Sequence, residues 1–521
     1  NLYSYAVKNK NPEVGTTGFI CEYNQSLVQF CEYACLSNNI IFNADCDTTP
    51  QPDFGDVLAL YDAYSQGTWQ SCVAATVNLN SMKLDSSQLD AIETALNQRL
   101  TIIQGPPGTG KTHTAVHLLK ALIESGRGPI LACAESNVAV DNLLEGLLDL
   151  NVNAVRFGRP IKVRENLRDA TLDAIVSSHP KQDEIRFIQE ENDAMRSKLN
   201  DLKGKDRGMA HRDINRNYRE IRDIEQRIVN GVLDSAQVLC STNIGAGHFT
   251  LASKKFPIVL IDEATQATEP SSLVPIVKGA RQLILVGDHM QLPPTVTSQN
   301  AENGGLDIPL FERLLQSGVK THMLTTQYRM HPTIREFPSA KFYENRLEDG
   351  CKSEDRPPAA GFLWPDWDKP VAFIPVHGAE ISEESGSSRY NLDEVSMVIK
   401  VVNDLLLPGD INVEDIGVIS PYAGQVRAIR EVLPDEMEHL EIKSVDGYQG
   451  REKEIIILST VRSNDQGSVG FLADSRRLNV AMTRAKRGLI VIGDDRTLRT
   501  NPTWSSWLDW IDESNLMAWH L

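Results

Sequence analysis

A glycine-rich run between an apolar stretch and a helix constrains this chain more than any other feature. Residues 105–112 fit the spacing G-x-x-x-x-G-K-[ST]. The preceding residues 100–103 are expected to form a buried strand, and residues 114–122 a helix. Backbone N–H groups of such a turn, at the positive end of a helix, suit phosphates. A coincidental glycine-rich turn is the alternative. The predicted phosphate loop consists of Gly105, Pro106, Pro107, Gly108, Thr109, Gly110, Lys111 and Thr112.

Two side chains of this loop have specific expected roles. Lys111 would reach the β- and γ-phosphates of a nucleotide, and the Thr112 hydroxyl would be a ligand of Mg²⁺. The sequence therefore predicts that the chain binds a nucleoside triphosphate.

The length and composition are those of a large globular chain. It has 521 residues, of which 41% are hydrophobic, so about three domains are a reasonable prior. No apolar run reaches the roughly 18 residues of a membrane span. The chain begins at Asn1 without a signal leader, and the missing Met suggests a fragment or a processed chain. An intracellular location, cytoplasmic or nuclear, is expected.

Charge and cysteine usage narrow the classes of partner. The net charge of −18 argues against a broad basic surface, so any nucleic acid is expected in a local groove. Eight cysteines in this length do not suggest a disulfide framework. Five of them lie within residues 1–72, where there is no histidine. Buried free thiols are the main interpretation, and a zinc or redox role is the alternative.

The pattern along the chain predicts an α/β protein. Apolar strands alternate with helical stretches, which is typical of parallel sheets. The first such unit is expected over 81–160 and 233–304, and the second over 305–521, with a strand at Met323–Leu324. Residues 161–232 would be an insertion, with two charged antiparallel helices turning near Gly204–Gly208. A solvated linker hairpin is the alternative. Residues 1–80 would be an accessory region.

Two carboxylates follow an apolar strand at residues 259–261. Phosphoryl transfer to water needs one acid to hold Mg²⁺ and a second to orient and deprotonate the attacking water. Asp262 fits the first role and Glu263 the second, at the sheet edge where ligands bind. Solvated acids at a strand end are the alternative.

Three further side chains are candidates for contacts with the γ-phosphate. The amide of Gln291 could bond a γ-phosphate oxygen and register its loss after hydrolysis. Arg329 and Arg484, in the second unit, could neutralise charge in the transition state, although an exposed arginine is usually only solvated.

Ten elements in a fixed order carry a resemblance to a known family. They are Gln88, GPPGTGKT (105–112), AESNVAVDNL (134–143), LCSTNIGAG (239–247), DEATQATEP (262–270), GDHMQLPPTV (287–296), QYRMHP (327–332), SPYAGQV (420–426), SVDGYQGREKE (444–454) and RRLNVAMTRAK (476–486). Together they resemble superfamily 1 RNA/DNA helicases of the up-frameshift-like group. This group includes the nonsense-mediated-decay helicase, senataxin-like proteins and the immunoglobulin-mu-binding helicase.

The resemblance, over residues 80–515, implies two tandem RecA-like parallel-sheet domains with ATP and Mg²⁺ between them. Gln88 would read the adenine edge, and Tyr328 would pack on the base. Gly450 and Glu452 would contact the nucleotide from the second domain. Arg329 and Arg484 would be arginine fingers acting in cis.

The resemblance also implies that a single strand of RNA or DNA crosses both domains. Hydroxyls, amides and helix N-termini suit sequence-independent holding of a phosphate backbone. For each residue alone, an N-cap or a turn hydrogen bond is the alternative. The expected strand contacts are Ser136, Asn137, Ser241, Thr242, Pro294, Tyr422, Gln425, Ser444 and Asp446.

These observations predict an ATP-dependent helicase or translocase, moving 5′ to 3′ by family resemblance. A nucleic-acid-stimulated ATPase that acts as a clamp or scaffold is the rival. A kinase or GTPase is disfavoured by Gln88 and by the second α/β unit. The chain is expected to be a monomer, with its N-terminal region a candidate for protein contacts. RNA and DNA remain equally open as substrates.

Overall fold

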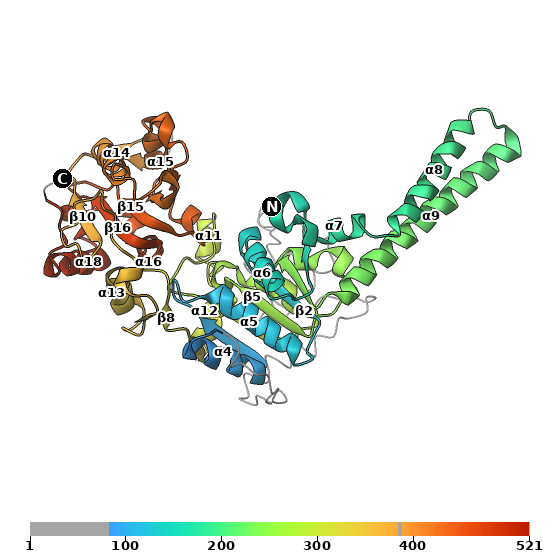
Figure 1. Cartoon of the computed structure of the whole chain (residues 1–521), viewed down its shortest axis with the longest axis horizontal. Coiled ribbons are helices and arrows are strands. Elements are labelled where there is room, and N and C mark those ends of the chain that lie inside the picture. Colours follow the sequence, from blue (N-terminus) through green and yellow to red (C-terminus); the bar gives the residue numbers. More distant parts are fainter. Residues whose placement is uncertain (1–82, 384–387, 520–521) are drawn as a thin grey trace, which may run out of the picture.

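The computed structural model describes residues 83–383 and 388–519, which form two α/β domains and a projecting helical arm (Figure 1). The expectations for residues 1–80 and their cysteines lie outside these residues. Within the described ranges, no helix is both long and apolar enough to cross a membrane.

The sheet of domain 1 has seven strands in the order β3-β4-β2-β5-β6-β1-β7, and every pairing is parallel. Its strands are nearly continuous apolar runs because both faces of the sheet are covered. The strands are β1 (Leu100–Gln104), β2 (Ile130–Ala134), β3 (Ala154–Phe157), β4 (Val238–Thr242), β5 (Ile258–Asp262), β6 (Gln282–Gly287) and β7 (Thr321–Met323).

Helices cover both faces of this sheet. One core lies under α4 (Ser86–Asn97), α5 (Lys111–Glu124) and α6 (Asn137–Asp149). The other lies under α10 (Glu269–Ile276), α12 (Leu310–Gln316) and the base of the arm. Short α11 (Gln299–Glu302) follows β6 in the chain. The carboxyl ends of the strands thus remain available for a site.

The boundary between the two domains differs from the expectation. β7 pairs with β1, and Leu310 and Phe311 of α12 lie in the core of domain 1. The second domain therefore begins after Leu324, so placing its start at residue 305 and a strand of the second unit at Met323–Leu324 was wrong. A three-residue strand carries no local signal for the sheet edge that it joins.

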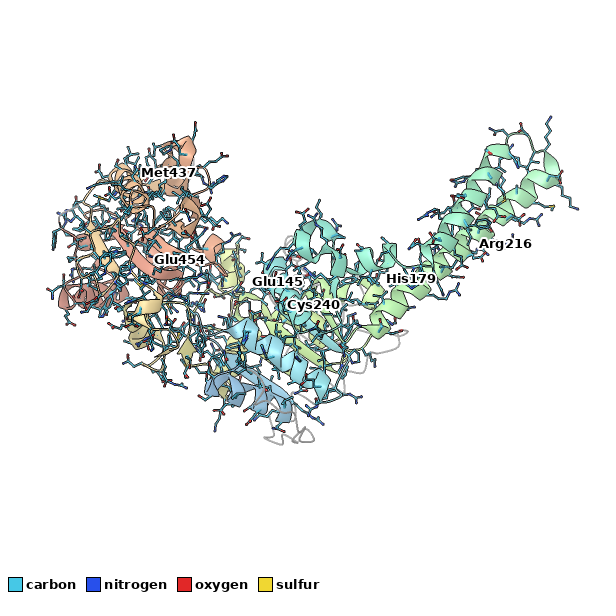
Figure 2. All side chains as sticks on the ribbon, in the orientation of Figure 1. Glu145, His179, Arg216, Cys240, Met437 and Glu454 are labelled. Carbon is cyan, nitrogen blue, oxygen red and sulfur yellow. The ribbon has the colours of Figure 1, made fainter. Side chains whose placement is uncertain are left out.

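The insertion forms a helical hairpin, as predicted. Its helices are α7 (Leu172–Ser177), α8 (Gln182–Lys198) and α9 (Gly204–Ser235). α8 and α9 run side by side away from domain 1 (Figure 1), and Arg216 lies far out on this arm (Figure 2). The chain reverses over 199–203, just before the predicted turn, and Gly204 opens α9 with a φ of +57°. Ile188 and Ile221 anchor the base in the core of domain 1.

Domain 2 is built on a five-stranded parallel sheet in the order β10-β16-β15-β13-β14. Domain 2 also contains two separate short strand pairs, β8 (Thr326–Gln327) with β9 (Glu348–Asp349) and β11 (Ile381–Ser382) with β12 (Arg389–Tyr390). The main strands are β10 (Val371–Pro375), β13 (Ile416–Ile419), β14 (Glu441–Lys443), β15 (Lys453–Ser459) and β16 (Ala485–Gly493).

The helices of domain 2 also form two layers. One core is shared with α14 (Leu392–Leu406) and α15 (Ala423–Glu431). The opposite core is shared with α13 (Pro332–Phe342), α16 (Ser475–Met482) and α18 (Pro502–Glu513). A short α17 (Asp495–Leu498) lies between β16 and α18 in the chain. Both domains therefore have the same helix–sheet–helix construction.

Candidate functional site

The phosphate loop connects β1 to α5 at the carboxyl edge of domain 1. Gly108 and Gly110 have φ values of +76° and +74°, which favour glycine. A Cβ at Gly105 would lie 2.0 Å from Cγ of Lys111, so this position also requires glycine. The Lys111 ammonium donates to the Gly105 carbonyl at 2.9 Å. The loop thus curls around its own lysine, with the N-terminus of α5 directly beneath it.

The acids at the end of β5 face this loop. The Thr112 hydroxyl donates to Asp262 Oδ2 at 2.9 Å, so the two predicted metal ligands are adjacent. Burial, and then the charge of Glu263, raises the pKa of Asp262 to about 7, although Thr112 and Lys111 oppose the shift. Glu263 has a left-handed backbone with φ of 50°, and its Oε2 accepts from Gln266 at 2.8 Å. The structure therefore places both carboxylates beside the phosphate loop.

Gln291 of domain 1 and Arg484 of domain 2 meet directly. Arg484 Nη2 donates to Gln291 Oε1 at 3.1 Å, and its Nε donates to the Val480 carbonyl at 3.0 Å. Burial, and then repulsion from Arg329, lowers the pKa of Arg484 to about 9. Glu263 is among the charges that oppose this shift. The predicted base and both predicted fingers therefore share one electrostatic environment.

Arg329 closes the same cleft from another segment. A Cβ at Gly108 would lie 2.8 Å from Cβ of Arg329, so the arginine directly adjoins the phosphate loop. Arg329 Nε donates to Glu452 Oε2 at 2.6 Å, and Nη1 donates to the Thr483 carbonyl at 2.9 Å. Burial alone would raise the pKa of Glu452, but Arg329 and Lys486 lower it. This ion pair holds the Arg329 guanidinium at the cleft.

The residues expected to contact the nucleoside lie at the outer side of the loop. The Gln88 amide donates to the Thr109 carbonyl at 3.1 Å, and Gln88 also forms the capping box of α4 with Asp85. Tyr328 is 43% exposed, and its hydroxyl donates to Asp85 at 3.0 Å. Burial, and then Asp85, raises the pKa of Tyr328 to about 12. Gly450 is exposed and has a φ of +74°.

The expected strand contacts of domain 1 lie at the carboxyl ends of β2 and β4. Ser136 is exposed and accepts from the Ala139 N–H at 3.1 Å as the N-cap of α6. Asn137 accepts from Arg156 at 2.9 Å. Thr242 accepts from the Gly245 N–H at 3.1 Å, whereas Ser241 is buried. Ser136 and Thr242 therefore hold their own loops, and Asn137 connects the start of α6 to β3.

The remaining expected strand contacts also include both exposed and buried side chains. Ser444 accepts from the Gly447 N–H at 3.2 Å, and Asp446 beside it is exposed. Tyr422, Gln425 and Pro294 are buried. The Gln425 amide donates to the Ser459 hydroxyl at 2.9 Å, and its Oε1 accepts from the Asn391 N–H at 2.8 Å. Pro294 lies in the loop after β6 of domain 1 and the other four lie after β13 and β14 of domain 2, and three of the five side chains are buried.

Comparisons with known proteins agree with this architecture. Two family models, each described as an AAA domain, match residues 83–299 and 306–496. A regulator of nonsense transcripts 1 homolog of Drosophila melanogaster is 40% identical over 442 residues, covering 84% of this chain and 36% of that protein. The ATP-dependent helicase NAM7 of Saccharomyces cerevisiae is 40% identical over 436 residues, covering 82% and 43%. The chain spans about a third of the length of the first curated relatives it matches.

The chain belongs to the superfamily 1 helicases of the up-frameshift-like group. Its two parallel α/β domains are the two RecA-like domains that the sequence predicted. Among solved structures, an arterivirus nonstructural protein 10 (helicase) covers 78% of this chain and 61% of that protein, at 14% identity and a TM-score of 0.38.

Beside the residues that the family motifs identify, the structure shows a buried connection that the sequence did not suggest. The Tyr343 hydroxyl donates to Asp288 Oδ2 at 2.7 Å and accepts from Asn479 at 2.7 Å. The Gln291 amide donates to the same Asp288 oxygen at 2.7 Å. Burial, and then Asp288, raises the pKa of Tyr343 well above its ordinary value. Tyr343 therefore links the Gln291 loop of domain 1 to α16, just before Arg484.

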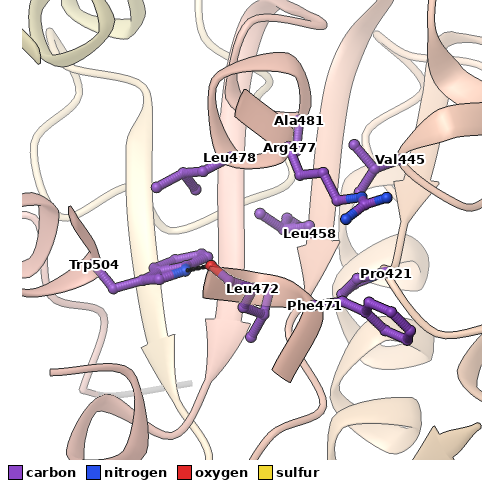
Figure 3. Close-up of a pocket in the computed structure, with 9 residues that line it drawn as sticks. All are labelled: Pro421, Val445, Leu458, Phe471, Leu472, Arg477, Leu478, Ala481 and Trp504. Carbon is purple, nitrogen blue, oxygen red and sulfur yellow. Dashed lines mark hydrogen bonds between the residues drawn. The ribbon is translucent and has the colours of Figure 1, made fainter. Parts of the chain in front are cut away.

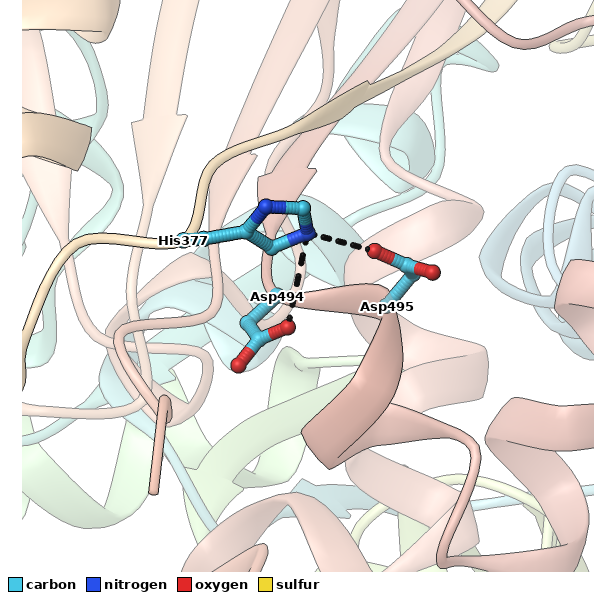
Figure 4. A group of neighbouring side chains, drawn as sticks. All are labelled: His377, Asp494 and Asp495. Carbon is cyan, nitrogen blue, oxygen red and sulfur yellow. Dashed lines mark hydrogen bonds and ion pairs between the residues drawn. The ribbon is translucent and has the colours of Figure 1, made fainter. Parts of the chain in front are cut away.

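A histidine and two acids form a separate cluster in domain 2. His377 follows β10, and Asp494 and Asp495 follow β16 (Figure 4). His377 Nε2 lies 2.8 Å from Asp495 Oδ1 and 3.7 Å from Asp494 Oδ1. Asp494 also accepts from the Ser463 hydroxyl at 2.9 Å and caps α17. His377 and the two aspartates thus form a hydrogen-bonded cluster that joins the loops after β10 and β16.

Proposed function

We propose that this chain is an ATP-dependent helicase that hydrolyses ATP between its two RecA-like domains and moves along single-stranded RNA or DNA. The observation that carries the proposal is the direct contact of Gln291 with Arg484 beside the Thr112–Asp262 pair. It joins the loop after β6 of one domain to an arginine of the other. A triphosphate bound there would contact both domains at once.

The residues of the cleft divide the chemistry among them. Glu263 orients the attacking water and accepts its proton, and Lys111 holds the β- and γ-phosphates. Arg329 and Arg484 neutralise the charge that develops on the transferred phosphoryl group, an effect worth roughly 10³–10⁵ in rate for such arginines. Their attachment to Glu452 and Gln291 holds them in place before the nucleotide arrives.

The donor set at Thr112 and Asp262 fits Mg²⁺. Asp262, which is fully buried, and the adjacent Glu263 place negative charge at this point of the cleft, and a small divalent cation would balance it. Mg²⁺ would supply charge neutralisation at the phosphates. Thr112 and Asp262 are the residues that would hold it.

ATP would couple the two domains through the loss of the γ-phosphate contact. While a triphosphate is bound, Lys111 from one domain and Arg484 from the other attract the same group. After hydrolysis and release of phosphate, that shared attraction is gone and the domains can separate. The loops after β2, β4, β13 and β14 would hold the strand, and alternate grip by the two domains would give steps in the 5′ to 3′ direction.

Strand displacement tests this proposal directly. Duplexes with a 5′ or a 3′ single-stranded overhang, in RNA and in DNA, are incubated with the chain, ATP and Mg²⁺. Displacement is expected only from the 5′ overhang, and Glu263→Gln is expected to bind ATP without turning it over. Rapid ATP hydrolysis without displacement would instead support the clamp. Unchanged hydrolysis by Glu263→Gln would contradict the assignment of the base.

A further inference from the structure

A half-exposed aromatic ring lies beside the expected strand contacts of domain 2. Phe471, in a short helical turn at Gly470–Ala473, is 51% exposed. Its ring centroid lies 5.5 Å from that of Tyr422. The guanidinium carbon of Arg477, on α16, lies 5.8 Å from the centroid of the Phe471 ring. Ring and cation are thus presented together at the carboxyl edge of the sheet (Figure 3).

The turn that carries Phe471 is attached to the core of domain 2. Leu472, next to it, is buried, and its carbonyl accepts from the Trp504 indole at 3.0 Å. Gly470 has a φ of +56°, and a Cβ there would lie 2.1 Å from Arg462 Nη1. Because Leu472 points into the core, Phe471 is directed outward. The position of the Phe471 ring is therefore fixed before a ligand binds. A base that stacks on the ring would not have to order the turn that carries it.

The hollow next to the Phe471 ring is too small to hold a base. It is lined mainly by apolar side chains, among them Pro421, Val445 and Leu478 (Figure 3). Its interior volume is only about 10 Å³, which is about the room that one water needs. A nucleobase is too large to enter, so it would lie on the exposed surface of Phe471 instead.

Arg477 can be recruited by a phosphate at little cost. Its nearest acids are Asp474 at 3.5 Å and Asp446 at 3.7 Å, and all three side chains are partly exposed. Ion pairs of this kind contribute little to stability. Since Asp446 and Ser444 flank Val445 at the hollow, the arginine lies on the expected path of the strand.

We propose that Phe471 and Arg477 form a stacking subsite for one base of a single-stranded nucleic acid. The base stacks on the Phe471 ring, and the Arg477 guanidinium binds the neighbouring phosphate. Stacking on an aromatic ring is tolerant of sequence because every base has a π-face. This inference rests on the proposed function and adds a contact that accounts for grip without a broad basic surface.

The binding of a short single-stranded oligonucleotide, measured by fluorescence anisotropy, tests the subsite. Phe471→Ala is expected to weaken binding about tenfold, within the range for loss of one stacked base. Phe471→Leu keeps apolar cover over Tyr422 but lacks a π-face, so it should bind as weakly, whereas Phe471→Trp should bind like the wild type. The matched control is Trp367→Ala. Trp367 is also about half exposed, at 53%, but it lies before β10, at the amino end of that strand and away from the carboxyl edge that carries Phe471.

An abasic site scanned through the oligonucleotide supplies the decisive comparison. At one position it should weaken binding by the wild type, yet cause no further loss in Phe471→Ala, because both changes remove one interaction. Arg477→Ala should instead reduce the slope of the logarithm of the binding constant against the logarithm of the salt concentration by about 1, because one phosphate contact is lost. Additive losses at every position, or Phe471→Leu binding like the wild type, would overturn the subsite.

Two controls separate this test from that of the proposed function. ATP hydrolysis without nucleic acid should be the same in Phe471→Leu and wild type, which shows that the fold and the cleft are intact. If the wild type binds no single strand, the proposed function itself fails. If the wild type binds, and Phe471→Ala and Phe471→Leu bind equally well, the subsite alone is wrong.

Discussion

The ATP cleft and the strand edge use the same kind of loops in different ways. In the cleft, charged side chains from two domains meet, as in the contact of Arg484 with Gln291. At the strand edge, the polar side chains mostly hold their own loops, as Ser136 and Thr242 do. Phosphoryl transfer needs charges at defined positions, whereas backbone holding can use N–H groups that any well-formed loop presents. Side-chain identity therefore carries more information in the cleft.

The largest expected effect comes from removing the contact between the domains. Arg484→Ala should lower kcat for ATP hydrolysis by about 10³-fold or more, because its charge acts on the transition state. Nucleotide affinity should change far less. Steady-state hydrolysis and binding of a fluorescent ATP analogue measure the two quantities.

Arg487→Ala is the matched control for this prediction. Arg487 lies in β16 three residues later and donates to the Pro357 carbonyl at 2.7 Å, outside the cleft. It should leave kcat close to that of the wild type. Loss of affinity without loss of kcat in Arg484→Ala would show that the arginine only binds the ground state.

A smaller effect is expected from removing the Tyr343 hydroxyl, which supports the Gln291 loop through Asp288. Tyr343→Phe keeps the volume of the side chain but leaves Asp288 without its hydroxyl donor. Loss of a buried hydrogen bond costs roughly 1–3 kcal/mol, so the resulting displacement of Gln291 should lower kcat about tenfold. KM for ATP should stay within about twofold, since Tyr343 has no expected contact with nucleotide.

The comparison of kcat with KM decides the role of Tyr343. Tyr448→Phe is the control, because Tyr448 is also buried and donates to the Glu441 carbonyl at 3.1 Å within domain 2. If both variants lose only thermal stability and keep kcat, Tyr343 is merely structural.

The smallest effect concerns the strand edge and appears as pH dependence of stability. Burial raises the pKa of Glu394 to about 8, despite hydrogen bonds from Ser459 and Val461. A raised pKa means that the folded protein binds this proton more tightly than the unfolded chain, so its contribution is complete below about pH 4.5 and is lost as pH rises towards 8. Thermal unfolding midpoints at pH 5 and pH 8 should show this loss in the wild type.

Glu394→Gln removes this titration. The variant should therefore gain stability relative to the wild type as pH rises between those values, and exposed Glu438→Gln should not. Because Ser459 connects Glu394 to Gln425, strand affinity should follow the same trend. A relative gain at low pH would contradict the assignment.

The motifs were sufficient to place the residues of the phosphate loop and the acids at the end of β5. Each depends on neighbours within a strand, turn and helix, where spacing fixes geometry. The division into two α/β units and the helical hairpin followed for the same reason. Gln425 was harder, because an amide in a loop motif does not show whether it faces solvent or a buried Ser459.

The local chemistry follows from residue order alone: a glycine-rich loop before a helix, and a strand that ends in two acids. The placement of Thr321–Met323 in the first sheet, and the connection from Asp288 through Tyr343 to Asn479, depend instead on how the folded chain packs. These are contacts between segments far apart in the chain, and burial in a shared core selects them. The spacing of residues within one motif therefore cannot predict these contacts.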